Sequence, residues 1–79
     1  MTLFKNAPVK NENKEKYTDD LEIAAEIARL ETLMEGNGRV LIRPSGTEPL
    51  VRVMIEGNDI EQITKLAEDL AALLNKRFG

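Results

Sequence analysis

The distribution of apolar and polar residues predicts four elements: a strand, a helix, a hairpin and a second helix. Residues 3–9 predict a short strand, and Pro8 restricts it to a sheet edge or a strand end because proline lacks a backbone donor. Apolar residues at helical spacing then predict a helix that starts near Thr18. Its apolar face consists of Ile23, Ile27, Leu30 and Met34. Gly and Asn at 36–38 end this helix, because both tolerate the left-handed conformation of a C-cap.

Two runs rich in β-branched residues predict the hairpin. Residues 40–42 and 51–55 flank the six residues 44–49, so the connection is longer than a tight turn. In the second run side chains alternate between two faces, with Val51, Val53 and Ile55 on one and Arg52, Met54 and Glu56 on the other. One face is expected to pack and the other to remain at least partly solvated.

Polar residues mark where each helix begins. Thr18 is the expected N-cap of the first helix, with acidic residues in the first turn at Asp19, Asp20 and Glu22. Asn58 and Glu61 resemble a capping box for the last helix, and Glu61 with Lys65 forms an i,i+4 pair. The apolar face of that helix is Ile63, Leu66, Leu70 and Leu73 or Leu74. The element order predicts an α+β fold, a small antiparallel sheet with helices packed on one face.

Composition narrows the function. The chain has 79 residues, which indicates a single small domain, and it has neither Cys nor His, the most common metal ligands. A net charge of −3 argues against nonspecific nucleic-acid binding, which needs clustered cations. No apolar run is long enough to span a membrane, and no signal peptide is evident, so a cytoplasmic location is expected. The charged segment 10–16 is interpreted as a solvated turn or linker.

The segment 43–52 carries the strongest chemical signal. Arg43 and Arg52 stand at the two ends of the hairpin loop, and the tip contains Ser45, Gly46 and Thr47. Guanidinium groups, hydroxyls and backbone N–H groups together suit a phosphate. Gly46 would allow positive φ, so that successive N–H groups converge on an anion, and the prolines Pro44 and Pro49 would stiffen the loop.

A plain turn is the alternative interpretation of the same residues. Ser, Gly, Thr and Pro are common in ordinary turns, and an arginine at a strand end is usually solvated or paired with a carboxylate. Glu48 is a candidate for that carboxylate. The residues alone leave both interpretations open.

The stretch 38–57, GRVLIRPSGTEPLVRVMIEG, resembles the C-terminal phosphate-binding loop of the α-D-phosphohexomutases. Within that superfamily it most resembles the bacterial phosphoglucosamine mutases, because phosphomannomutase/phosphoglucomutase relatives tend to carry Asn in place of Gly46. The segment 4–14 and both predicted helices also resemble the last domain of these enzymes. The resemblance implies a TATA-box-binding-protein-like fold and a single C-terminal domain over 1–79, with a leading strand and turn in 1–17 and the helix, hairpin and helix in 18–79.

The resemblance also implies a function. The parent enzyme would interconvert glucosamine 6-phosphate and glucosamine 1-phosphate, on the route to the amino-sugar nucleotide of the bacterial cell wall. It would use a phosphoserine, a bisphosphate intermediate and Mg²⁺, all held by other domains. Its last domain grips the phosphate that is not reacting. In this role Arg43 is the main charge partner, Arg52 a second cation, Ser45 and Thr47 hydroxyl donors and Gly46 a backbone donor, while Pro44, Glu48 and Pro49 shape the loop.

No catalytic or metal-binding residue is predicted in this chain. Ser45 is the only serine and is already assigned to the phosphate, and Asp19 with Asp20 is better explained by helix capping. The chain alone is therefore expected to lack mutase activity and to bind no metal, its partners being a phosphosugar and the other domains of the parent enzyme. The alternatives are the same domain of a phosphomannomutase/phosphoglucomutase, a free-standing phosphate-binding module, or a purely structural α+β domain.

Overall fold

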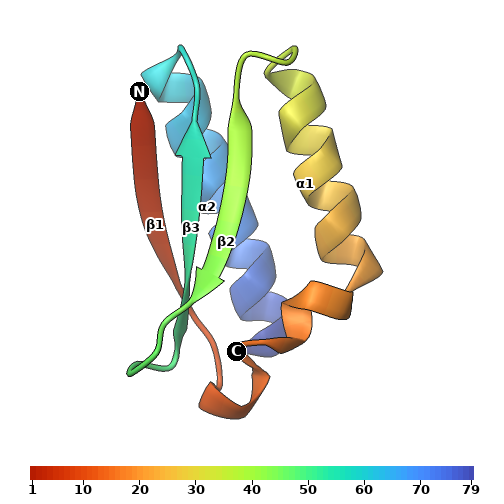
Figure 1. Cartoon of the computed structure of the whole chain (residues 1–79), viewed down its shortest axis with the longest axis vertical. Helices are drawn as coiled ribbons and strands as arrows, with labels where there is room; N and C mark the ends of the chain where they lie inside the picture. Colours follow the sequence, from red (N-terminus) through yellow and green to blue (C-terminus); the bar gives the residue numbers. More distant parts are fainter.

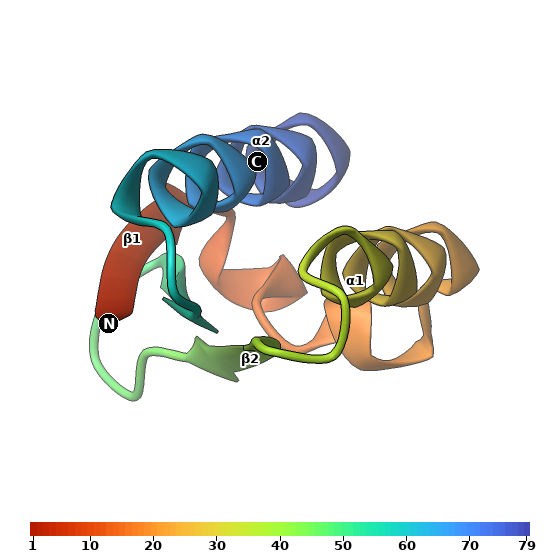
Figure 2. The same ribbon diagram turned by 90° about the horizontal axis from the view of Figure 1, so that it is seen from above.

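The computed structural model describes all residues from 1 to 79, and it contains one three-stranded antiparallel sheet (Figure 1). The strands are β1 (Thr2–Pro8), β2 (Arg39–Pro44) and β3 (Leu50–Glu56), in the order β1-β3-β2. Two helices, α1 (Leu21–Leu33) and α2 (Ile60–Phe78), lie on the same side of the sheet (Figure 2). The predicted fold class and element order are confirmed.

The central strand β3 determines which face of the sheet packs. Its alternate residues Val51, Val53 and Ile55 are at most 1% exposed, as the alternation predicted. β1 is an edge strand with Pro8 at its end, in agreement with the restriction that proline imposes. The opposite face of the sheet carries no helix, so the side chains there remain open to solvent.

The core is entirely apolar and fills the space between the sheet and the two helices. No buried polar or charged residue occurs in the chain. On α1, Ile23 and Leu30 are buried, as is Met34 at the C-cap, and Ile27 packs against them half-buried. On α2 the buried face is Ile63, Leu66, Ala67, Leu70, Ala71, Leu74 and Phe78, with Leu73 partly buried beside it. The apolar faces predicted for both helices are thereby confirmed.

The N-cap of each helix lies one or two residues later than the predicted one. Asp20 caps α1, accepting from the backbone N–H groups of Glu22 and Ile23 at 2.9 and 3.0 Å. Thr18 lies instead in a short 3₁₀ helix, Lys16–Asp19, and donates to the Glu15 carbonyl at 3.0 Å. The Thr18 cap was therefore wrong, because the tight turn before the helix uses that hydroxyl.

The predicted start of α2 is corrected in the same way. Asp59, not Asn58, is the N-cap, and its carboxylate accepts from the N–H groups of Glu61 and Gln62 at 3.0 and 3.2 Å. A carboxylate caps a helix as well as an amide does and adds a favourable interaction with the helix dipole.

The predicted pair of Glu61 with Lys65 does not form. Lys65 pairs instead with Asp69 at 3.1 Å, one turn further along α2. Lys65 has an acid one turn away on either side, and pairs of this kind are worth only a few tenths of a kcal/mol, so the two arrangements differ little in energy.

The connections on the helix side are held by specific contacts. α1 ends in a turn in which Glu35 and Gly36 adopt positive φ, at 55° and 78°. The charged segment 10–16 is a turn, as predicted, but not a free linker. The backbone N–H of Lys10 and the side-chain amide of Asn13 both donate to the Phe78 carbonyl, at 2.9 and 3.1 Å.

No helix of the chain is long and apolar enough to cross a membrane.

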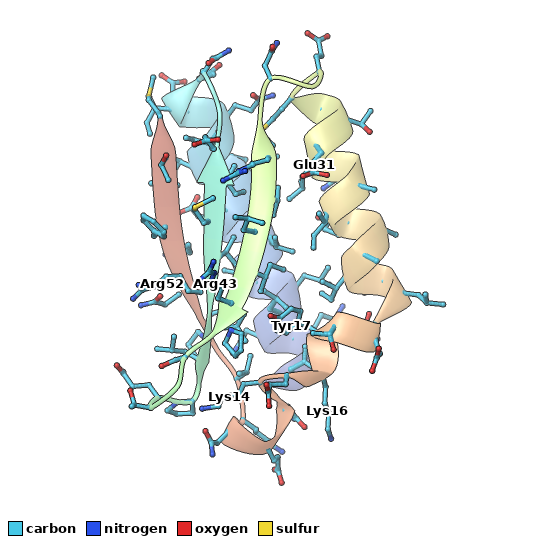
Figure 3. The ribbon with its side chains drawn as sticks, in the orientation of Figure 1. Lys14, Lys16, Tyr17, Glu31, Arg43 and Arg52 are labelled. Carbon is cyan, nitrogen blue, oxygen red and sulfur yellow. The ribbon has the colours of Figure 1, made fainter.

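Two side chains satisfy the outer edge of β2. The Glu31 carboxylate accepts from the Val40 N–H at 3.2 Å, and the Tyr17 hydroxyl donates to the Ile42 carbonyl at 3.1 Å. Figure 3 shows Tyr17 and Glu31 on the side of β2 that faces α1. Burial, and secondly the nearby charge of Glu15, raises the pKa of Tyr17, so this hydroxyl remains a donor. Edge groups of β2 that would otherwise be unpaired are thus bound within the chain.

Candidate functional site

The open face of the sheet is organised in three rows that run across the strands. The register places one residue of β1, one of β3 and one of β2 in each row. The rows are Thr2–Glu56–Arg39, Phe4–Met54–Leu41 and Asn6–Arg52–Arg43. A charged row at one end and another beside the hairpin loop therefore flank an apolar row.

The two charged rows differ in how their arginines are balanced. Arg39 pairs with Glu56, with Nε and Oε1 3.6 Å apart. Arg43 and Arg52 instead face each other across the strands, and neither has an ion pair (Figure 3). Like charges directly opposite in an antiparallel pair are unfavourable. An anion between the two guanidinium groups would remove that repulsion.

The loop between these arginines is closed by one hydroxyl. The Ser45 Oγ accepts from the backbone N–H groups of Thr47 and Glu48 at 3.3 and 3.1 Å, and the Ser45 N–H donates to the Leu50 carbonyl at 3.0 Å. The loop is also bound to the residue that follows β1, because the Val9 N–H donates to the Pro49 carbonyl at 3.1 Å. The connection is five residues, 45–49, because Pro44 still belongs to β2.

The expectation that Gly46 uses a positive φ is wrong. Gly36 is the only glycine with positive φ, so Gly46 does not create a nest by adopting the left-handed region. A hydroxyl that accepts from two successive N–H groups turns the chain in its place, as serine commonly does in turns. Apart from Gly46 itself and its two chain neighbours, no residue has an atom within 4 Å of the position where a Cβ on Gly46 would be, so the glycine is not required by packing either.

The sequence-predicted residues divide into two groups in the structure. Arg43, Arg52, Ser45 and Pro44 line one open hollow of about 220 Å³ together with Leu50. That volume is several times the roughly 30 Å³ that a water molecule occupies in the liquid. The remaining predicted residues, Gly46, Thr47, Glu48 and Pro49, are exposed at the loop tip and do not line it. Glu48 forms no ion pair with either arginine, so it does not neutralise them.

Sequence reasoning missed two residues of the leading strand. Asn6 accepts from the Arg52 Nε at 3.3 Å, and the Phe4 ring lies beneath the same guanidinium, 5.9 Å from its Cζ to the ring centroid. Their alternate spacing on a strand was visible in the sequence. Their place opposite Arg52 depends on a strand pairing that spans 46 residues.

The perturbed carboxylates lie in ion pairs elsewhere. The hydrogen bonds from Arg77, at 2.7 and 3.0 Å, are the main cause that lowers the pKa of Asp20, and Arg29 lowers that of Glu26. Both acids belong to ion pairs of the helices, so they hold structure and do not mark a catalytic acid. No three His, Cys, Asp or Glu side chains converge, so the residues present do not fit a magnesium site.

Residues 5–73 match the family described as phosphoglucomutase/phosphomannomutase, C-terminal domain. The chain belongs to this family. It is 60% identical over 74 residues to the phosphoglucosamine mutases of Caldanaerobacter subterraneus subsp. tengcongensis and Clostridioides difficile (strain 630), which covers 94% of this chain and 17% and 16% of those proteins. It is also 60% identical over 72 residues to that of Clostridium tetani. This C-terminal domain thus spans about a sixth of the length of the curated relatives it matches, and the predicted resemblance is confirmed.

Proposed function

We propose that this chain is the substrate-phosphate-binding domain of a phosphoglucosamine mutase. The observation that carries the proposal is the pair Arg43 and Arg52, two opposed guanidinium groups without a carboxylate beside a loop of hydroxyl and N–H groups. Forked guanidinium donors match phosphate oxygens well, and charge-assisted hydrogen bonds are the strong ones. The relatives are phosphoglucosamine mutases, which supports glucosamine phosphate as the substrate over mannose or glucose phosphate.

In the proposed reaction the parent enzyme interconverts glucosamine 6-phosphate and glucosamine 1-phosphate through a phosphoserine and a bisphosphate intermediate. Arg43, Arg52 and Ser45, which line the hollow, hold the phosphate that is not reacting, and Gly46 and Thr47 donate to it from the exposed loop tip. Binding energy at a remote group orients the reacting end without touching it. Because the bisphosphate must present each of its two phosphates in turn, a grip built on charge and simple donors suits both orientations.

The chemistry itself is proposed to lie outside this chain. Ser45 is the only serine, and its Oγ already accepts from two backbone N–H groups, which leaves it a poor nucleophile candidate. Mg²⁺ would likewise be held by other domains, and no step proposed for this chain passes through a metal. The remaining alternatives are the same domain of a phosphomannomutase/phosphoglucomutase and a free-standing phosphate-binding module.

A backbone amide NMR titration of the chain tests this function. Inorganic phosphate and glucosamine 6-phosphate should cause saturable shifts at Ser45, Gly46 and Thr47, and glucosamine alone should cause none. If neither phosphate shifts these amides up to tens of millimolar, the loop is either a plain turn or a half-site too weak alone. Arg43→Ala in the full-length enzyme then decides between the two, and an unchanged KM for glucosamine 6-phosphate would overturn the proposal. The same samples should show no conversion of glucosamine 6-phosphate, and turnover by the chain alone would contradict the assignment of chemistry to other domains.

A further inference from the structure

Arg52 is held from the side opposite Arg43 by the leading strand. Asn6 on β1 pairs with Arg52 in the sheet register and accepts from its Nε at 3.3 Å. Phe4, two residues earlier on the same face, lies beneath the guanidinium, with 5.9 Å between Cζ and the ring centroid. The Phe4 side chain is 58% exposed, so it does not serve the core.

The geometry leaves the rest of the guanidinium free. An arginine has five N–H donors, and the bond to Asn6 uses only the one on Nε. Both Nη groups stay available for an anion. Without Asn6, repulsion from Arg43 and the rotamer freedom of a long side chain would both move the guanidinium away from the loop.

The residue type at position 6 fits this role. At the other end of the ladder the partner of an arginine is a carboxylate, Glu56, which neutralises Arg39. An amide oxygen also holds an arginine by a hydrogen bond, but because the amide is neutral the positive charge of the guanidinium is not neutralised. The aromatic face of Phe4 adds an attraction for the cation that also brings no opposing charge.

We infer that Asn6 and Phe4 are positioning residues that hold Arg52 ready for the substrate phosphate, so that β1 is part of the binding site. This inference rests on the proposed function, since it concerns the same phosphate. It extends the site from the loop to a strand that lies more than 30 residues earlier in the chain. The sheet register, and not the loop sequence, brings these residues together.

Phosphate titrations of Asn6→Ala, followed by NMR at the loop amides and at the Arg52 Nε–H, test the inference. Affinity for inorganic phosphate should fall about 3- to 10-fold, the change expected when binding must immobilise one long side chain that was held before. The Arg52 Nε–H resonance should also shift before any phosphate is added. In an Arg52→Ala background the same substitution should have no effect, because these two residues act as one unit. Phe4→Leu should weaken binding about 2- to 5-fold, as loss of one exposed cation–π contact predicts.

Thr2→Ala is the matched control, because Thr2 occupies the same open face of β1 opposite Glu56 and should leave affinity unchanged. If Asn6→Ala binds phosphate like Thr2→Ala while Arg52→Ala binds more weakly, the positioning role is wrong and the proposed function stands. An equal loss from Asn6→Ala with and without Arg52 would also overturn it, since Asn6 would then act independently. If Arg52→Ala leaves affinity unchanged, Arg52 is not part of the phosphate grip and the inference fails with it.

Discussion

At one end of the β2–β3 ladder Arg39 faces Glu56, and at the other end, beside the hairpin loop, Arg43 faces Arg52. Both rows lie on the open face of the sheet and use the same two strands, β2 and β3. The first row is an ordinary surface ion pair of the kind that is worth little. The second row is an unfavourable arrangement that the isolated fold does not need.

The glycines at the two ends also differ, in whether packing or backbone geometry requires them. At the Arg39 end, a Cβ on Gly38 would contact the Glu56 carbonyl oxygen at 2.5 Å, and one on Gly57 would contact the Ile63 side chain at 2.7 Å. Gly36, in the same region, has a φ of 78°. At the loop end Gly46 meets neither condition.

Packing and backbone geometry therefore explain the glycines at the Arg39 end but not Gly46 at the loop end. Residues that cost stability or bring none, and that gather at one loop, are expected where a site binds a ligand. This contrast supports a functional loop more directly than its composition does, because serine, glycine and proline are common in any turn.

The largest effect is expected from substituting Arg43, which tests the difference between the loop end and the Arg39 end of the ladder. Arg43→Ala should weaken binding of inorganic phosphate roughly 10- to 100-fold, since a hydrogen bond to a charged group contributes about 1.5–3 kcal/mol. Arg39→Ala, the matched control on the same strand and face, should change affinity less than about 2-fold because exposed, distant charges are screened. Titration calorimetry or NMR at constant ionic strength measures both. Equal losses from the two variants would show a diffuse cationic surface in place of a site.

Alanine at the glycines tests the contrast through stability. Gly38→Ala should destabilise the fold by about 1–3 kcal/mol, the usual cost of overpacking, because the backbone oxygen of Glu56 cannot move aside. Gly46→Ala should leave the free energy of unfolding unchanged or raise it by up to about 1 kcal/mol, since alanine restricts the unfolded chain. Urea denaturation measures both. A clear loss of stability in Gly46→Ala would mean that the loop backbone needs glycine after all.

The fold was largely predictable because its signals are local. Alternation in 51–55 and helical spacing in both helices gave the correct faces, and these follow directly from the period of each element. The two helix caps were misplaced because Thr18, Asp20, Asn58 and Asp59 are all acceptable caps. The neighbouring turn, which propensity does not describe, decides among them.

The candidate site was predictable only where its residues are close in sequence. The segment 43–52 is continuous, so its two arginines could be placed at one hairpin end. The contribution of Asn6 depends on β1 pairing with the far side of β3, which no local pattern specifies. The role of Ser45 was foreseen only as a donor to phosphate, whereas in the structure its oxygen accepts from two N–H groups and shapes the loop.

The smallest effect is expected from reversing the charge at position 43, which tests the same difference between the two ends of the ladder. Arg43→Glu places a carboxylate opposite Arg52 and so gives the loop end the arrangement found at the Arg39 end. Relief of repulsion and a new cross-strand pair should stabilise the fold by about 0.5–1 kcal/mol at low salt, and salt should reduce that gain. Urea denaturation at two salt concentrations measures it.

Glu56→Arg is the reciprocal control, because it creates opposed arginines at the end that lacks the loop. It should lose a similar amount of stability and gain no phosphate affinity, since Ser45 and its neighbours are absent there. Adding phosphate should then stabilise the wild-type chain by mass action but not Arg43→Glu, so the stability difference between them should shrink or reverse as phosphate rises. If Arg43→Glu were no more stable than the wild type at low salt, the two arginines would not be repelling each other, and their pairing would cease to argue for a bound anion.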